Sequence, residues 1–95
     1  VSIVPYDTLD EAIALVNESE LALNAGIYTN VLTDAMKAAE EIEAGAVIIN
    51  DIPTFRVDNM PYGGVKMSGY GKEGIKYAVE EMTDLKFITM KLNYE

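Results

Sequence analysis

A stretch rich in glycine and proline, residues 50–73, constrains what this chain can fold into more than any other feature. Five of the seven glycines lie in the segment 63–74, and two of the three prolines stand just ahead of it. Glycine permits positive φ angles and close backbone approach, whereas proline fixes φ and lacks an amide proton. The stretch is therefore predicted to be a shaped, irregular loop between a strand that ends at Ile49 and a helix that begins near Lys72. Loops of this length are usually functional or disordered, and the aromatic residues in this one argue against disorder.

The apolar pattern on either side of this loop predicts alternating strands and helices. Short β-rich runs predict strands at residues 2–6, 25–29 and 46–49. The last run is continuous and apolar, which is typical of a strand buried on both faces. Apolar residues at helical spacing predict helices at residues 9–18, 31–42 and 72–82, and alternation predicts a final strand at residues 85–92. This order favours the α/β class, with a partial, mostly parallel sheet and packed helices.

Several residues mark the expected helix ends. Thr8 and Glu11 match a capping box, in which two side chains satisfy free amide groups at the start of a helix. Asn30 or Thr33 is expected to cap the second helix. Gly45 is expected just beyond the C-terminal end of that helix, where glycine is common.

Charge and composition argue against several classes of site. The 16 acidic and 7 basic residues give a net charge of −9, which argues against binding nucleic acid or an anionic membrane. The chain has no cysteine and no histidine, so disulfides, thiol nucleophiles, triads and metal sites are not expected. No apolar run reaches the roughly 18 residues of a transmembrane helix, and no signal peptide is visible. The expected location is the cytoplasm.

The segment Gly69–Gly74 matches the G-x-G-x-x-G pattern of dinucleotide-binding proteins. That pattern needs a strand leading straight into the first glycine and an acidic residue after a second strand about 20 residues later. Residues 63–68 are instead expected to be loop, so we interpret the glycines as positions that let the loop fold tightly onto the next helix. Within the loop, Lys66 and Ser68 are expected to form structural hydrogen bonds rather than to bind an anion.

Arg56 is the most informative polar residue of the loop. It is one of only seven basic residues, and its planar guanidinium group suits a carboxylate or a phosphate. An ion pair with Asp51 or Asp58 is an equally weighted alternative. Tyr62 is expected either to line an apolar pocket or to pack under the loop.

A series of ordered landmarks resembles the C-terminal part of the NAD(P)-dependent aldehyde dehydrogenase superfamily. The most specific is P-Y-G-G-V-K-M-S-G-Y-G-K-E-G at residues 61–74, which is similar to the family's P-F-G-G-x-K-x-S-G-x-G-R-E. Shorter landmarks are D-E-A-I at residues 10–13, L-N-A-G-I-Y-T at 23–29, I-E-A-G at 42–45 and I-N at 49–50. The resemblance runs from Val1 almost to Tyr94. Tyr62 in place of the usual Phe and Lys72 in place of the usual Arg are conservative departures.

The resemblance implies that the catalytic Cys, the general-base Glu and the cofactor domain all lie upstream of this chain. The full-length enzyme would convert an aldehyde, NAD(P)+ and water to a carboxylic acid and NAD(P)H, whereas this chain alone would bind no cofactor and be inactive. Residues 1–83 correspond to the C-terminal part of the catalytic domain, and residues 84–95 to the oligomerisation strand and tail. The expected partners are the upstream polypeptide, further copies of the subunit joined through the C-terminal strand, and a small aldehyde.

The resemblance also assigns residues 51–60 to a segment that shapes the aldehyde entrance, and Tyr62 to an aromatic wall. The run D-I-P-T-F-R-V-D at residues 51–58 is similar to a subgroup that acts on small polar or anionic aldehydes, such as semialdehydes, lactaldehyde or glyceraldehyde 3-phosphate. Arg56 is then the candidate for the substrate's anionic end, with Phe55 and Tyr62 also expected to bind substrate. Two alternatives are an independent α/β module that binds a partner or anion through the glycine-rich loop, and a dimerisation domain that depends on the last strand.

Overall fold

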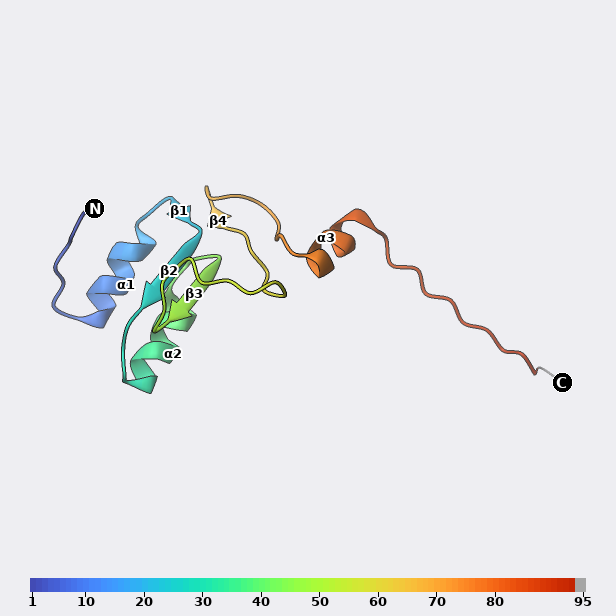
Figure 1. Ribbon diagram of the computed structural model, residues 1–95, viewed down its shortest axis with the longest axis horizontal. Helices are drawn as coiled ribbons and strands as arrows, with labels where there is room; N and C mark the ends of the chain where they lie inside the picture. Colours follow the sequence, from blue (N-terminus) through green and yellow to red (C-terminus); the bar gives the residue numbers. More distant parts are fainter. Residues whose placement is uncertain (94–95) are drawn as a thin grey trace.

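The computed structural model describes residues 1–93 of this chain. These residues form three helices and four strands. Figure 1 shows a molecule that is compact at the N-terminal end and drawn out at the other. The elements in chain order are α1 (Leu9–Asn17), β1 (Leu21–Ala22), β2 (Asn24–Ile27), α2 (Leu32–Glu41), β3 (Ala46–Ile49), β4 (Val65–Lys66) and α3 (Ile75–Met82). This arrangement confirms the predicted α/β class.

Two small sheets organise the compact part. Strands β2 and β3 are parallel and pair from Asn24 opposite Ala46 to Ile27 opposite Ile49. Strands β1 and β4 are antiparallel, with Leu21 opposite Lys66, so the glycine-rich loop returns to the residues that follow α1. The strand predicted at residues 25–29 is observed as β2, which begins one residue earlier and ends two residues earlier. The predicted parallel pairing is confirmed for the sheet of β2 and β3.

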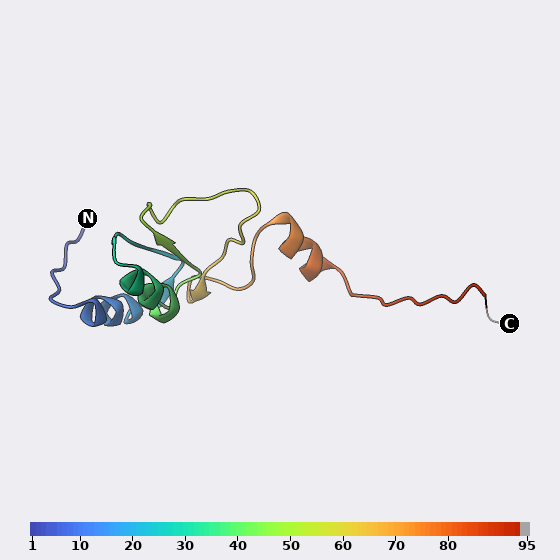
Figure 2. The ribbon, with the colours of Figure 1, turned by 90° about the horizontal axis from the view of Figure 1, so that it is seen from below.

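Helices and loop lie on opposite sides of β2 and β3. Figure 2 shows α1 and α2 next to each other beneath the two strands, with residues 50–62 above them. The small buried core consists of Ile13, Ala22, Ala35 and Ala38. On the loop side, a Cβ added to Gly26 would lie 3.1 Å from Cγ of Pro53, so the loop crosses directly over β2.

The helix-end predictions are partly confirmed. Thr8 is the N-cap of α1 and its Oγ1 accepts a hydrogen bond from the Glu11 amide at 3.2 Å, while Glu11 reaches back to the Asp7 amide. The prediction for α2 was wrong, because its N-cap is Val31 and makes no side-chain cap bond.

Gly45 is not the residue that ends α2. The helix ends at Glu41 and its C-cap is Ile42. Glycine is required at position 45 for space, because an added Cβ would overlap the carbonyl oxygen of Gly63 and lie 2.8 Å from that of Leu23.

Four predicted elements differ from the structure, and two of them are absent because a strand exists only where a neighbour supplies hydrogen bonds. Residues 2–6 and 85–92 pair with no other segment within residues 1–93, so neither forms a strand. Strand β3 pairs only with β2 among the described residues and is half-buried rather than buried on both faces. Helix α3 begins at Ile75 instead of Lys72, since Gly71 and Gly74 have φ angles of 71° and 128°, outside the helical region.

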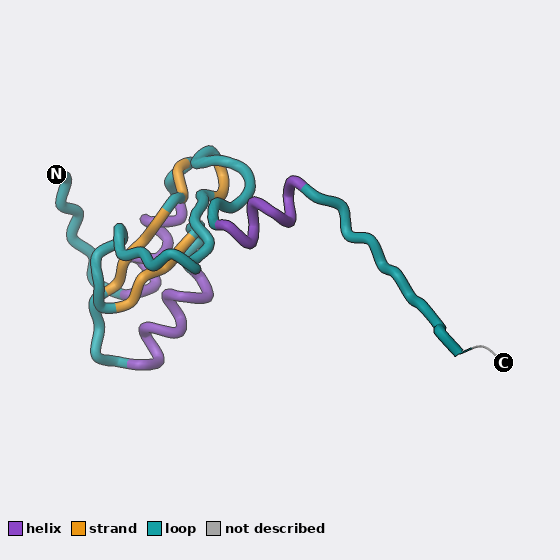
Figure 3. Tube along the Cα trace, turned by 45° about the vertical axis from the view of Figure 1, so that its right-hand side comes forward, coloured by secondary structure: helices purple, strands orange, loops and turns teal. Residues whose placement is uncertain are grey.

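The C-terminal third leaves the compact part. The radius of gyration is 19.3 Å, against about 12 Å for a compact chain of this length. The accessible surface is 8193 Å², against about 5400 Å² for a folded monomer of this mass. Helix α3 has no buried residue, and the arm that follows it extends away from the sheets (Figure 3). The division into residues 1–83 and 84–95 stays a prediction, and residues 94–95 lie outside the described part.

None of the helices in the described part of the chain is long and apolar enough to cross a membrane.

Candidate functional site

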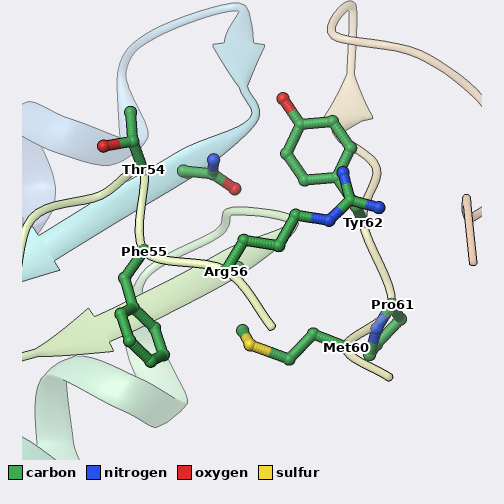
Figure 4. A pocket seen from close by; sticks show the side chains of 8 residues that line it. Thr54, Phe55, Arg56, Met60, Pro61 and Tyr62 are labelled. Atoms are coloured by element: carbon green, nitrogen blue, oxygen red, sulfur yellow. The ribbon is translucent and has the colours of Figure 1, made fainter. Parts of the chain in front are cut away.

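The loop crossing over β2 and β3 encloses a hollow of about 200 Å³. It lies between the loop and the first residues of the two parallel strands, and we call it the loop hollow (Figure 4). Its lining residues are Asn24, Ala46, Thr54, Phe55, Arg56, Met60, Pro61 and Tyr62. The structure therefore brings together all three residues that the sequence singled out for substrate binding, while their role stays a prediction.

Arg56 and Tyr62 form the central contact of the loop hollow. The guanidinium carbon of Arg56 lies 4.5 Å from the centre of the Tyr62 ring, within the range of a cation–π interaction. The alternative prediction, an ion pair of Arg56 with Asp51 or Asp58, was wrong. Within residues 1–93 the ion pairs involve only Lys37 and Lys66 as cations. The fork of Arg56 thus faces no carboxylate in this part of the chain.

Phe55 lines the same hollow from the other side of the loop. Figure 4 shows its ring pointing away from the Arg56–Tyr62 pair, and the residue is 46% exposed. Phe55 therefore contributes apolar surface at the edge of the hollow and makes no contact with the guanidinium group in this arrangement.

Sequence reasoning did not find the rest of the lining. Asn24 and Ala46 are far apart in sequence and meet only because they are the first pair in the β2–β3 register. The other lining residues are Thr54, Met60 and Pro61, which belong to the same loop as Arg56. Their place in that loop was the only sequence feature that could have indicated them.

Backbone hydrogen bonds fix the position of Tyr62. Its amide donates to the carbonyl oxygen of Glu73 at 3.0 Å, and the Glu73 amide donates to the carbonyl oxygen of Tyr62 at 2.5 Å. Lys72 adds a hydrogen bond from Nζ to the Gly63 carbonyl oxygen at 2.9 Å. These contacts close residues 62–73 into a loop that holds the aromatic wall of the hollow.

Lys66 and Ser68 have structural partners, as the sequence indicated. Lys66 donates to the carbonyl oxygen of Asn17 at 2.8 Å and forms an ion pair with Glu43 at 2.6 Å. Ser68 Oγ accepts a hydrogen bond from the Ala22 amide at 2.7 Å. Asn17 has a structural role that sequence reasoning missed: its Nδ2 donates to the carbonyl oxygen of Glu41, the last residue of α2, and its Oδ1 accepts from the amide of Glu43 just beyond the helix.

The residues present do not fit a bound dinucleotide at the segment Gly69–Gly74. Strand β4 ends at Lys66 and α3 begins at Ile75. The dinucleotide motif needs a strand that runs directly into Gly69 and a helix that follows at once, and neither is present here. This arrangement supports the interpretation of a tight loop. Across residues 1–93, no group of three or more acidic side chains could hold a metal ion.

Comparison with known proteins gives consistent results. Residues 1–88 match the aldehyde dehydrogenase family. The chain is 58% identical over 92 residues to 3-sulfolactaldehyde dehydrogenase of Priestia aryabhattai, a match that covers 97% of this chain and 19% of the relative. It is 53% identical over 81 residues to lactaldehyde dehydrogenase of Methanococcus maripaludis, covering 85% of this chain and 17% of the relative.

A solved structure agrees in fold. The crystal structure of glyceraldehyde-3-phosphate dehydrogenase GapN from Methanocaldococcus jannaschii, complexed with NADP, superposes with a TM-score of 0.77 at 51% identity. The match covers 81% of this chain and 17% of that one, so this chain spans less than a fifth of the length of the proteins it resembles. Sequence and fold together show that the chain belongs to the aldehyde dehydrogenase family.

Proposed function

We propose that this chain is part of an NAD(P)-dependent aldehyde dehydrogenase that oxidises a small polar or anionic aldehyde, and that it supplies a wall of the substrate pocket and a subunit contact. The observation that carries the proposal is the loop hollow. Among its lining residues, Arg56 bears the one charge, and Thr54, Asn24 and Tyr62 add neutral polar groups. A hollow with a single positive group in a chain of net charge −9 suits an anionic end.

The division of labour follows from the residue types present. The nucleophile of the family reaction is a Cys, and this chain has none, so the bond-making steps belong to residues outside it. Family members solved with a cofactor hold NAD+ or NADP, which accepts the hydride of the aldehyde when bound. This chain's own residues orient the aldehyde and exclude water, and the chain alone is inactive.

The names of the relatives support a small substrate. Sulfolactaldehyde and glyceraldehyde 3-phosphate each carry an anionic group, whereas lactaldehyde carries none. All three are short aldehydes, and the loop hollow, about 200 Å³ in volume, is of a size for such molecules. Arg56 would bind the sulfonate, phosphate or carboxylate through its planar fork.

The test is Arg56→Met in the full-length enzyme, with Lys76→Met as the matched loss of a positive charge outside the loop hollow. We expect Arg56→Met to raise KM for an anionic aldehyde about 10- to 100-fold relative to a neutral one, the usual worth of a charge-assisted hydrogen bond. Lys76→Met should leave this ratio unchanged. If Arg56→Met also leaves it unchanged, the anionic substrate class is wrong.

Subunit contact is proposed for residues 85–92. Leu85, Phe87 and Ile88 are 102%, 89% and 72% exposed, and the extended backbone has unpaired amides and carbonyls within residues 1–93. Such an edge favours pairing with another chain. The test is the mass in solution of the 95-residue chain, together with its circular dichroism spectrum. A folded dimer or larger oligomer supports the contact, and a folded monomer contradicts it.

A further inference from the structure

We infer that Tyr62 is a positioning residue: its ring holds the guanidinium group of Arg56 in place, and through it sets the preference for anionic over neutral aldehydes. The inference rests on the proposed function, because it assumes that Arg56 binds the anionic end of the substrate. It adds a second residue to that selectivity and a physical reason for the aromatic side chain at position 62.

The Arg56 side chain is in contact with the Tyr62 ring. The guanidinium carbon of Arg56 lies 4.5 Å from the centre of the Tyr62 ring. An aromatic ring at this distance attracts the cation. The N–H donors of arginine lie in the guanidinium plane, so a ring over one flat face leaves them free for a bidentate anion. Figure 4 shows the Arg56 side chain reaching across the hollow to Tyr62.

Arg56 has no ion-pair partner within residues 1–93 that could hold its side chain in place of Tyr62. Arg56 is exposed and lies in an irregular loop, and no carboxylate of residues 1–93 pairs with it. A long side chain without an anchor loses rotamer entropy when it binds a ligand. The Tyr62 ring is the anchor that the structure supplies, so it reduces this loss before the substrate arrives.

Tyr62 itself is held rigidly. Its main chain exchanges two hydrogen bonds with Glu73, at 3.0 and 2.5 Å, and the following residue, Gly63, accepts a hydrogen bond from Lys72. Tyr62 is half-buried, whereas Arg56 is exposed. The better-fixed partner therefore positions the more mobile one, and the direction of the effect runs from Tyr62 to Arg56.

The experiment measures KM and kcat of the full-length enzyme with an anionic aldehyde and its neutral analogue, for Tyr62→Leu, Tyr62→Phe, Arg56→Met and the double variant Arg56→Met/Tyr62→Leu. The quantity compared is the ratio of KM for the anionic aldehyde to KM for its neutral analogue. We expect Tyr62→Leu to raise this ratio about 2- to 5-fold, the usual worth of an exposed cation–π contact. Tyr62→Phe keeps a ring and should restore a ratio near that of the wild type. Any loss of general pocket shape affects both substrates and cancels in the ratio.

The double variant separates this inference from the proposed function. If Tyr62 acts through Arg56, the double variant has the same ratio as Arg56→Met alone, because the ring has nothing left to position. If the two effects multiply, or if Tyr62→Leu raises both KM values equally, Tyr62 is only a wall of the pocket and the inference is wrong while the role of Arg56 stands. If Arg56→Met itself leaves the ratio unchanged, the proposed substrate class fails.

Two further variants keep the test decisive. Tyr70→Leu makes the same chemical change at a fully exposed residue outside the loop hollow and should leave the ratio unchanged. Arg56→Lys retains the charge but lacks the flat face and the fork, so it serves if Tyr62→Leu does not fold. Positioning by stacking predicts a ratio for Arg56→Lys close to that of Arg56→Met. A ratio close to the wild type would show that charge alone suffices and would overturn the inference.

Discussion

Lys66 and Glu43 form an ion pair of 2.6 Å that ties the glycine-rich loop to the residues beyond α2. The same ammonium group donates to the carbonyl oxygens of Asn17 and Ser19, at 2.8 and 3.4 Å, where α1 ends. A cation at this position satisfies carbonyl groups that have no partner within the helix. Lys66 therefore joins three parts of the chain at one point.

We predict that Lys66→Met weakens this junction more than Glu43→Gln does. Removing the ammonium group eliminates the ion pair and both carbonyl contacts, at a cost of about 1–2 kcal/mol. Glu43→Gln removes only a largely exposed ion pair, which is worth less than about 1 kcal/mol. Hydrogen exchange of the last-turn amides of α1 in the intact protein measures both effects as local opening. Equal loss of protection in the two variants would contradict this account.

Gly45→Ala should be among the most damaging small substitutions in the chain. The added Cβ would overlap the carbonyl oxygen of Gly63, and both neighbours are main-chain atoms that cannot rotate away. We expect a loss of at least about 2 kcal/mol, seen as a lower melting temperature and a lower soluble yield of the intact protein. The control is Gly69→Ala, where no atom lies within 4 Å and only the φ of 140° opposes a side chain. Gly45→Ala should lower the melting temperature more than this control does.

Asn50 combines an unusual backbone conformation with two side-chain hydrogen bonds. Its φ is 59°, its Oδ1 accepts from the Thr29 amide at 2.8 Å, and its Nδ2 donates to the Thr29 carbonyl oxygen at 2.9 Å. Both Asn50→Ala and Asn50→Gly lose these bonds, but only alanine also carries the cost of positive φ, about 1 kcal/mol. We predict that the melting temperature falls further for Asn50→Ala than for Asn50→Gly. The reverse order would contradict the assignment of backbone strain.

Lys37 gives a prediction of pH dependence. The hydrogen bond that it donates to Asp10, and then the charges of Asp10 and Glu41, raise the pKa of Lys37 above its ordinary value of 10.5. A group whose pKa is raised on folding stabilises the fold at pH values below its unfolded pKa and loses that contribution as the pH rises through the folded value. The stability difference between wild type and Lys37→Met should therefore stay constant from neutral pH to about pH 9 and shrink in strongly alkaline solution. Melting temperatures measured across this range check the sign.

Local patterns allowed much of the fold to be predicted. The Thr8 cap, the three helices and the strand before the loop follow from residue spacing within a few positions, because each depends on neighbours in the sequence. The prediction that Lys66 and Ser68 form structural hydrogen bonds is confirmed, but their partners, Asn17 and Ala22, lie outside the loop rather than within it. Sequence reasoning failed where an element needs a distant partner, as at residues 2–6 and 85–92, since a strand is defined by hydrogen bonds to another segment.

The candidate site shows the same division. Residue chemistry singled out Arg56 as a rare arginine and Tyr62 as an aromatic residue of a structured loop, and the family resemblance added Phe55 and predicted that all three bind substrate. Residue chemistry left open whether Arg56 pairs with Asp51 or Asp58, and the tertiary structure decided against both within the described residues by placing the guanidinium group on Tyr62.

By itself, the sequence determined the α/β class, the position of the shaped loop and the chemical types at the site, because these depend on side-chain identity and local spacing. Only the tertiary structure decided that Asn24 and Ala46 lie beneath the loop, that Gly45 must lack a side chain, and that the guanidinium group of Arg56 lies over the Tyr62 ring. These relationships join residues far apart in the chain or separated by loop residues with no regular repeat. They arise from packing and strand register, which a one-dimensional pattern does not contain.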